Sequence, residues 1–510
     1  MTLLFAAGAG TAGAFTGCTN INSPGGYTLD GDITDSGVSS CINITSSNVV
    51  LDGQNNVVDG VDGVGTVGIN VTNPSTTLTN VTVRNINVTD WDIGIEYNDV
   101  DNGEITGVNA TRNDGLGAGI RLNSSSRNDV IDNDASGNNI GIRLDFSSNN
   151  NNVTSNEMNS NTNNFGINLF ASDGNNLISN NATGNRLGIS LSSSNGNNIT
   201  DNNASGNSED GIGIAGSSNN NEVIDNDANG NGDTGISFSF ASGNNMTSND
   251  VTNNDANGIL LSSSSGNNVT SNNASRNGFD GIFLESSSDN NEVTGNNVIG
   301  NSDDGIYLES SNNNIVSGND IADAGSNGTV IDDAVNVTLR NNNITSVGLT
   351  NFPNADAIRL LGSSSDITVT GGKIDLSASG RNGVQGFGLG YTSVTGLTVK
   401  NVDIEGVTIG VDLQNGDSST IRGNNITNSG AGGVSITGSP NSVIENNLIE
   451  TAGTGNTATD GILFGGNDIV VSGNMADEVQ SADAGITALF SASGSVVSNN
   501  TVKDIRGGDG

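Results

Sequence analysis

A glycine followed by a short apolar strand recurs along this chain at intervals of 22 to 25 residues. The copies read GIRL, GINL, GISL, GILL, GIFL or GIYL, and this alternation is the pattern of a strand buried on one face. The glycines that begin the regular copies are Gly94, Gly119, Gly141, Gly166, Gly188, Gly211, Gly235, Gly258, Gly281 and Gly305. A unit this short buries no core alone, so it is stable only when stacked on copies of itself.

The repeats therefore predict an all-β fold, a parallel β-helix of about 18 coils with two or three short strands in each coil. Two inward columns of aliphatic side chains should form the core. The first is Ile120, Ile142, Ile167, Ile189, Ile212, Ile236, Ile259, Ile282 and Ile306, and the second is Leu122, Leu144, Leu169, Leu191, Ile214, Phe238, Leu261, Leu284 and Leu308. The absence of helical periodicity argues against leucine-rich repeats, which have a similar length.

The regularity of the repeat divides the chain into four predicted segments. Residues 1–14 are expected to be the remnant of a signal peptide, and residues 15–67 an N-terminal cap with the first coil. Residues 68–326 should form regular coils, and residues 327–510 less regular ones, where the intervals reach 31 residues.

The charge balance excludes one class of partner. The formal net charge is −40, from 55 acidic and 15 basic residues with no histidine. Nucleic acid binding is excluded because no basic surface exists to neutralise phosphates. An acidic, lysine-poor surface suits a protein that stays soluble in strong salt, so we expect a halophilic source. A merely acidic extracellular protein is the alternative.

The N-terminus and the two cysteines both point to export. Ala12 and Ala14 form an A-x-A pattern that a signal peptidase could cut, and no stretch is long and apolar enough to span a membrane. Cys18 and Cys41 are one repeat apart, so adjacent coils would place them within reach of a disulfide, which forms in oxidising compartments. The alternative is lipid attachment at Cys18. We expect an extracellular or cell-surface location.

Asparagine is frequent in the turns of the repeat. Asn198, Asn245 and Asn268 precede apolar residues in NNIT, NNMT and NNVT, and we expect their amides to stack from coil to coil. There are 18 N-x-[ST] sequons, and those inside these turns should be poorly accessible.

The segment CTNINSPGGYTLDGDITDSGVSSCINITSSNVVLDGQNNVVDG, residues 18–60, resembles the opening of haloarchaeal surface proteins with NosD-like repeats. The copies GIRLNSSSRNDVIDNDASGNN and GIFLESSSDNNEVTGNN resemble the repeat of the same family, and the likeness covers about residues 18–505. The resemblance implies a right-handed parallel β-helix. That fold hosts lyases, hydrolases, epimerases and adhesins, so it does not define a function. The copper role of the founding members is not supported, because this chain has no histidine and only 4 scattered methionines.

Two consecutive repeats, GIFLESSSDNNEV and GIYLESSNNNIV, carry an aromatic residue and a Glu at matching positions that should point outward. The predicted ligand-binding residues are Phe283, Tyr307, Glu285 and Glu309, and the predicted metal ligands are Asp280, Asp303 and Asp304. Exposed aromatics beside acids suit sugars, clustered carboxylates suit Ca²⁺, and two carboxyls about 5 Å apart suit a retaining glycosidase. A solvated acidic surface is the alternative.

A second outward column carries Glu96, Arg121 and Arg143, with Asp145 close by. The lack of histidine removes Ser/His/Asp and Cys/His catalysis, which leaves carboxylate or arginine chemistry. Arg121, Arg143, Asp145, Glu285 and Glu309 are therefore the catalytic candidates, the arginines as the base of a polysaccharide lyase. The alternative for the arginines is an ion-pair ladder, since Arg at its ordinary pKa is a poor base.

We expect a structural or adhesive β-helix protein that binds polysaccharide or Ca²⁺ on an outward face. The alternative is a carbohydrate-active enzyme, a lyase or a glycosidase, acting on the same face. End-to-end self-association is a further expectation, because stacked coils have open edges at both ends.

Overall fold

The computed structural model describes residues 13–113, 115, 117–161, 164–348, 355–376, 382–387, 394–450, 460–479, 484–489 and 491–504. The chain divides into two compact units, Met1–Asp250 and Val251–Gly510, which are considered in turn. The described residues form strands and turns with no helix, so they include no helix that could cross a membrane. The predicted signal segment 1–14 lies almost entirely outside the described residues.

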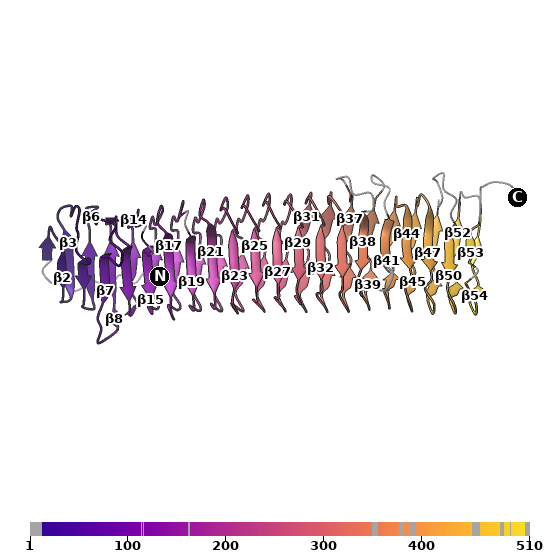
Figure 1. Ribbon diagram of the computed structural model, residues 1–510, viewed down its shortest axis with the longest axis horizontal. Coiled ribbons are helices and arrows are strands. Elements are labelled where there is room, and N and C mark those ends of the chain that lie inside the picture. The colour runs from indigo at the N-terminus through magenta and orange to yellow at the C-terminus, as the bar shows by residue number, and fades with distance from the viewer. Residues whose placement is uncertain are drawn as a thin grey trace, which may run out of the picture. The chain divides into compact units, whose positions relative to one another are not determined.

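The first unit stacks short parallel strands coil upon coil (Figure 1). Its first sheet consists of β2 (Thr19–Ile21), β4 (Ser40–Ile44), β7 (Val67–Thr72), β11 (Ile93–Asn98), β15 (Ala118–Asn123), β17 (Ile140–Asp145), β19 (Phe165–Phe170), β21 (Leu187–Ser192), β23 (Ile212–Ala215) and β25 (Ile236–Ser239). Its second sheet consists of β1 (Gly13–Phe15), β3 (Gly25–Leu29), β5 (Val49–Asp52), β9 (Val81–Arg84), β13 (Glu104–Thr106), β16 (Asp129–Ile131), β18 (Asn152–Thr154), β20 (Asn176–Ile178), β22 (Asn198–Thr200), β24 (Glu222–Ile224) and β26 (Asn245–Thr247). A third sheet holds β6 (Val57–Asp59), β10 (Asn87–Thr89) and β14 (Asn109–Thr111), and β8 (Leu78–Thr79) pairs with β12 (Val100–Asp101).

The second unit repeats this arrangement. Its first sheet consists of β27 (Ile259–Ser262), β29 (Ile282–Glu285), β32 (Ile306–Glu309), β35 (Thr329–Asp332), β38 (Asp356–Leu361), β41 (Asn382–Phe387), β44 (Ile409–Gln414), β47 (Gly432–Thr437), β50 (Ile462–Gly465) and β53 (Ile486–Ala488). Its second sheet consists of β28 (Asn268–Thr270), β30 (Glu292–Thr294), β33 (Ile315–Ser317), β36 (Thr338–Arg340), β39 (Thr368–Thr370), β42 (Thr398–Lys400), β45 (Thr420–Arg422), β48 (Val443–Glu445), β51 (Val470–Ser472) and β54 (Val496–Ser498). Its third sheet consists of β31 (Asn297–Ile299), β34 (Asp320–Ala322), β37 (Asn343–Thr345), β40 (Lys373–Asp375), β43 (Asp403–Glu405), β46 (Asn425–Thr427), β49 (Leu448–Glu450), β52 (Met475–Asp477) and β55 (Thr501–Val502).

The predicted aliphatic columns form the core of both units. In the first unit Ile142 pairs with Ile167 and Ile167 with Ile189, and these three side chains are fully buried. In the second unit Ile282 pairs with Ile306 in the same way. Each β-branched side chain thus packs on its counterpart one strand spacing away, about 4.8 Å. The structure confirms the predicted parallel β-helix.

Buried asparagines form ladders between the sheets, but one position earlier than predicted. The backbone N–H and side-chain amide of Asn175 both donate to Asn197 Oδ1, at 2.8 and 3.1 Å. Asn197 donates to Asn221 in the same way. The predicted ladder residues Asn198, Asn245 and Asn268 instead begin three-residue strands and point outward, because the next residue points inward. The prediction that the sequons at these positions are poorly accessible is therefore wrong.

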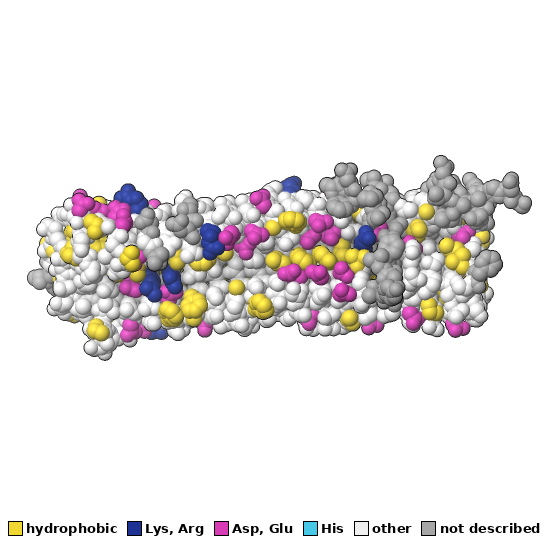
Figure 2. Space-filling view, viewed as in Figure 1, with side chains coloured by type: hydrophobic (Ala, Val, Ile, Leu, Met, Phe, Trp, Pro, Cys, Tyr) yellow, Lys and Arg dark blue, Asp and Glu magenta, His cyan; other side chains and the backbone are white. Residues whose placement is uncertain are grey.

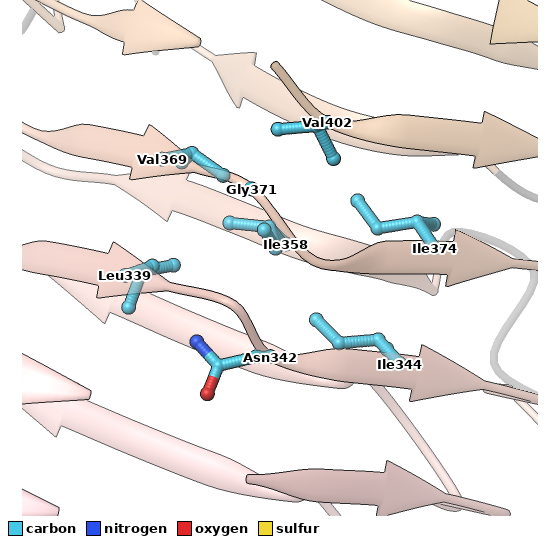
Figure 3. Close-up of a pocket in the computed structure, with 8 residues that line it drawn as sticks. All are labelled: Leu339, Asn342, Ile344, Ile358, Val369, Gly371, Ile374 and Val402. Carbon is cyan, nitrogen blue, oxygen red and sulfur yellow. The ribbon is translucent and has the colours of Figure 1, made fainter. Parts of the chain in front are cut away.

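The second unit contains one small cavity among the described residues that bears on ligand binding. This cavity is lined by Leu339, Asn342, Ile344, Ile358, Val369, Gly371, Ile374 and Val402 (Figure 3). Its volume is about 10 Å³, room for one water molecule at most. This cavity is therefore too small for a ligand larger than water.

A disulfide joins the first coils, as predicted. Cys18 and Cys41 are bonded across a Cα–Cα distance of 4.5 Å, next to the pairing of β2 with β4. The bond occupies the Cys18 thiol, so lipid attachment through that sulfur is excluded. Because disulfides persist in oxidising compartments, the bond indicates an exported protein.

Candidate functional site

An apolar column lies on the outward face of the first sheet in the second unit. Leu260, Phe283, Tyr307 and Val330 occupy matching positions on β27, β29, β32 and β35, and of these Val330 is buried, with only 3% of its surface exposed. Figure 2 shows a line of hydrophobic side chains bordered on both sides by Asp and Glu. The rings of Phe283 and Tyr307 stack with centroids 4.9 Å apart and planes 15° from parallel. Because the rings of Phe283 and Tyr307 cover each other's facing sides, a ligand would contact the ring edges and the Tyr307 hydroxyl.

Carboxylates follow this column at the ends of the same strands. Glu285 closes β29, Glu309 closes β32, and Asp332 pairs with Glu309 on β35. All three side chains are half-buried. The Tyr307 hydroxyl donates to Asp332 Oδ2 at 3.5 Å, and burial followed by the charge of Asp333 raises the pKa of Asp332. Glu285 and Glu309 therefore lie on adjacent coils beside the two rings.

The predicted metal ligands meet at the start of the same strands. Carboxylate oxygens of Asp280, Asp303 and Asp304 lie within 4.8 Å of one another, close enough to hold one cation. Asp280 and Asp304 are only 6% and 7% exposed, whereas Asp303 is half-buried. The structure thus brings together the three residues that the sequence singled out.

Asp280 and Asp304 also belong to a capping column that crosses the coils. The backbone N–H of Asp304 donates to Asp280 Oδ1 at 3.0 Å, and that of Asn327 donates to Asp304 Oδ1 at 2.7 Å. Asn257 and Asn327 accept the N–H groups of Asp280 and Asp356 in the same manner. Asparagine and aspartate therefore fill one structural position, and only aspartate adds charge.

The local charge makes ionisation of this cluster unfavourable. From Asn277 to Asp333 the sequence contains no Lys or Arg. Burial, and then the charge of Asp304, raises the pKa of Asp280 to about 8. Burial also raises the pKa of Asp304. A bound cation would compensate these buried charges, and a retained proton on Asp280 is the alternative.

The arginine column in the first unit is an ion-pair network. Arg121 contacts Glu96 at 3.3 Å and Asp145 at 3.1 Å, and Arg143 contacts Asp145 at 2.8 Å. The Asp145 side chain is fully buried, so the two guanidinium groups compensate its charge. Burial raises the pKa of Glu96. This geometry favours the ion-pair ladder, because both arginines are held by carboxylates.

Sequence reasoning missed the outer members of the apolar column and the third acid. Leu260, Val330 and Asp332 lie on the flanking copies GILLS and GTVID, where aromatic residues and glutamates are absent. Aligning outward positions over four consecutive copies would have found them.

The fold is a parallel β-helix, and its outer face carries aromatic and carboxylate side chains. The model of the family described as right handed beta helix region matches residues 166–302, 230–374 and 386–510, and the chain belongs to this family. Residues 41–233 also match the model described as periplasmic copper-binding protein (NosD). The comparison with curated proteins gave no match.

The comparison with solved structures found matches of low identity. The periplasmic alginate epimerase AlgG is 16% identical, with a TM-score of 0.33, 75% of this chain and 77% of that chain covered. An alginate lyase from Paenibacillus sp. str. FPU-7 is 15% identical, with a TM-score of 0.30 and coverages of 63% and 93%. The catalytic domain of a GH87 alpha-1,3-glucanase is 12% identical, with a TM-score of 0.26 and coverages of 76% and 60%.

The matched NosD region does not carry copper ligands. Within residues 41–233 there is no histidine, and the sulfur-containing side chains are those of Cys41 and Met158. Cys41 is in the disulfide and Met158 is fully buried. Copper requires imidazole or clustered sulfur ligands, so these residues do not fit the metal.

Proposed function

We propose that this is an exported structural or adhesive β-helix protein that binds polysaccharide on the outward face of its second unit. The binding face comprises Phe283, Tyr307, Glu285 and Glu309, with Ca²⁺ held by Asp280, Asp303 and Asp304. The acidic composition supports a halophilic source and an extracellular or cell-surface location, where high salt screens the charge.

The observation that carries the proposal is the stacked pair Phe283–Tyr307 with carboxylates at both ends of the same strands. Ring edges and a tyrosine hydroxyl suit the mixed apolar and polar surface of a sugar ring. Carboxylates accept hydrogen bonds from sugar hydroxyls, and charge-assisted bonds are the stronger ones.

A cation adds a reason for acidic polysaccharides to bind an acidic protein. Without Ca²⁺ the carboxylates of a polyuronate would be repelled by the acids around Tyr307. The cluster of Asp280, Asp303 and Asp304 supplies oxygen ligands from adjacent coils, and Ca²⁺ accepts further oxygens from outside the protein. A bound Ca²⁺ would therefore bridge the protein and the polymer.

The test measures binding and turnover together. The purified protein in molar salt is incubated with alginate, dextran or mannan, in Ca²⁺ or in EDTA. Affinity electrophoresis follows binding, while reducing ends and unsaturated uronate absorbance follow cleavage. We expect Ca²⁺-dependent binding of alginate without product, and about tenfold weaker binding for Tyr307→Ala. Leu463→Ala, at an equivalent outward position of β50, is the matched control and should bind normally.

Product that disappears in Glu285→Gln or Glu309→Gln would replace the adhesive role with hydrolysis. Product that disappears in Arg143→Ala would point to a lyase in the first unit. Equal alginate binding by the Asp303→Asn variant and the wild type would remove Ca²⁺ from the proposal, and no binding of any polymer would overturn it.

A further inference from the structure

Left-handed backbone recurs at one corner of the first unit, directly after the strands of the first sheet. The residues in this column and their φ values are Ser124 (51°), Phe146 (48°), Ala171 (48°), Ser193 (53°), Gly216 (62°) and Phe240 (52°). Glycine adopts this backbone freely, other small residues do so at a cost, and a bulky side chain with positive φ is a genuine outlier. Phe146 and Phe240 are therefore the two residues of the column that this backbone favours least.

The core does not require these phenylalanines either. Phe146 is 51% exposed and Phe240 is 65% exposed. Phe170, at the end of β19, is 38% exposed and lies edge to face against Phe146, with ring centroids 5.4 Å apart. Among the described residues, the matching positive-φ column of the second unit contains no aromatic side chain; it includes Ser263, Ser286, Ser310, Asp333, Gly362, Asn415 and Gly438. Strained, exposed aromatics that serve neither core nor turn indicate a binding role.

The surface around Phe146, Phe170 and Phe240, here called the Phe line, is mostly uncharged, although Asp173, two residues after Ala171, is exposed and accepts the Asn195 N–H. The strand residues beside the corner column are Ser192, Ala215 and Ser239 on β21, β23 and β25. The nearby charge of Asp145 is buried and paired with two arginines. Figure 2 shows two hydrophobic patches on this unit with uncharged surface between them.

The spacing along the line suits an extended ligand. Phe146 and Phe240 are separated by Ala171, Ser193 and Gly216, so they lie four strand spacings apart, about 19 Å. The residues between them are small and offer hydroxyl and backbone groups. Stable protein interfaces bury roughly 1,200 Å² or more of well-packed surface, which isolated rings on a serine-rich corner do not resemble.

We propose that the Phe line is a second carbohydrate site, which binds an uncharged polysaccharide chain along the direction in which the coils stack. The apolar C–H faces of sugar rings would pack on the phenylalanines, and serine and backbone groups would bond the hydroxyls. Among the described residues, the line has no group of three carboxylates that could hold a cation, and it belongs to a chain of net charge −40, so acidic polymers are disfavoured. This inference takes from the proposed function only that the ligand is a polysaccharide.

The test compares wild type with the double variant Phe146→Ser and Phe240→Ser. Serine already occupies this column at Ser124 and Ser193, so the variant should fold and unfold at an equal or higher temperature. Affinity electrophoresis in gels containing dextran, mannan or mixed-linkage β-glucan should show wild-type retardation and at least about tenfold weaker binding by the variant. Val64→Ser removes another exposed apolar side chain of this unit and should leave binding unchanged.

A second double variant, Phe146→Leu and Phe240→Leu, keeps apolar surface but removes the ring faces, and it should lose binding like the serine variant. Wild-type binding by the leucine variant, or no retardation of wild type by any of the three polymers, would overturn the proposal. So would a dimer, detected by sedimentation, that disappears in the serine variant. Tyr307→Ala should leave this binding intact while it weakens Ca²⁺-dependent alginate binding, so each site fails independently.

Discussion

Asp280 shows how one residue serves structure and chemistry at once. Its Oδ1 accepts the N–H of Asp304, a task that asparagine performs at Asn257 and Asn327 in the same column. Aspartate performs it at an electrostatic cost, because burial and Asp304 disfavour the ionised form. A residue kept at such a cost, where a neutral one would fit, is the kind found at binding sites.

The first prediction concerns Asp280→Asn. The folded-state pKa is about 8 and the ordinary value is 3.8, so the folded state holds a proton that the unfolded state releases. The contribution of Asp280 is therefore fully present below pH 3.8 and is lost as the pH rises to about 8. Because asparagine does not ionise, the Asp280→Asn variant does not lose this stability as the pH rises. In EDTA at pH 8.5 we expect about 1 kcal/mol or more of added stability, since each tenfold change in a proton-binding constant corresponds to about 1.4 kcal/mol.

Urea unfolding at pH 5 and pH 8.5 measures this difference. Asp289→Asn, on a turn of the same coil, is the control and should change stability little at either pH, because asparagine keeps the Oδ1 that accepts the Asn312 N–H. A variant at Asp280 that is equally destabilised at both pH values would show that the carboxylate is required for the fold itself.

At this scale the sequence identified the outward aromatics, the two glutamates and the aspartate triad. Alternation along the strand places Phe283 and Tyr307 outward, and a period of 24 residues places them on adjacent coils. It did not show that the two rings cover each other, because ring orientation depends on side-chain packing. Nor did it single out Phe146 or Phe240, whose left-handed backbone is not visible in composition.

At the scale of elements, the buried ladders connect one coil to the next. Asn197 accepts two hydrogen bonds from Asn175 in the previous coil and donates two to Asn221 in the following one. The bonds lie in the interior, where an unpaired amide group costs most. The strands are only three residues long beside these ladders, so the ladder bonds add to the few hydrogen bonds that each strand makes.

The second prediction compares adjacent residues of one turn. Asn197→Ala leaves the buried N–H of Asn175 without an acceptor, and we expect a loss of about 2–4 kcal/mol from this and the other broken bonds. Asn198→Ala removes an outward side chain that accepts from the Thr200 hydroxyl, and should change stability by less than about 0.5 kcal/mol. Chemical denaturation of both variants measures the difference, and a reversed order would contradict the ladder.

The fold was predictable because its repeat is regular, whereas the register of the ladder was not. Inward Ile and Leu positions follow directly from alternation, but in a run such as NNIT the sequence does not show which asparagine turns inward. Asn197 does so because Asn198 already belongs to β22, where Ile199 points inward.

At the scale of the whole molecule, charge dominates. With a net charge of −40 on 510 residues, the acidic side chains repel one another in the folded and the unfolded state. The repulsion is stronger in the folded state, which is more compact. The third prediction is that the unfolding temperature rises by several degrees or more between about 0.1 and 1 M NaCl, as the screening length falls from about 10 Å to about 3 Å. Differential scanning calorimetry measures it, with sucrose of equal osmolality as the control. An unfolding temperature that sucrose raises as much as salt would contradict the electrostatic cause.

The register of the coils has a consequence for how such a chain changes over generations. Ile189 pairs with Ile167 on one side and with Ile212 on the other, and Asn197 lies between Asn175 and Asn221. Removing residues 189–211 would bring Ile212 onto Ile167 and Asn221 onto Asn175, with every column restored. Unequal crossing-over between the DNA segments that encode adjacent coils would therefore yield a shorter or longer protein that still folds, and selection can adjust its reach one coil at a time.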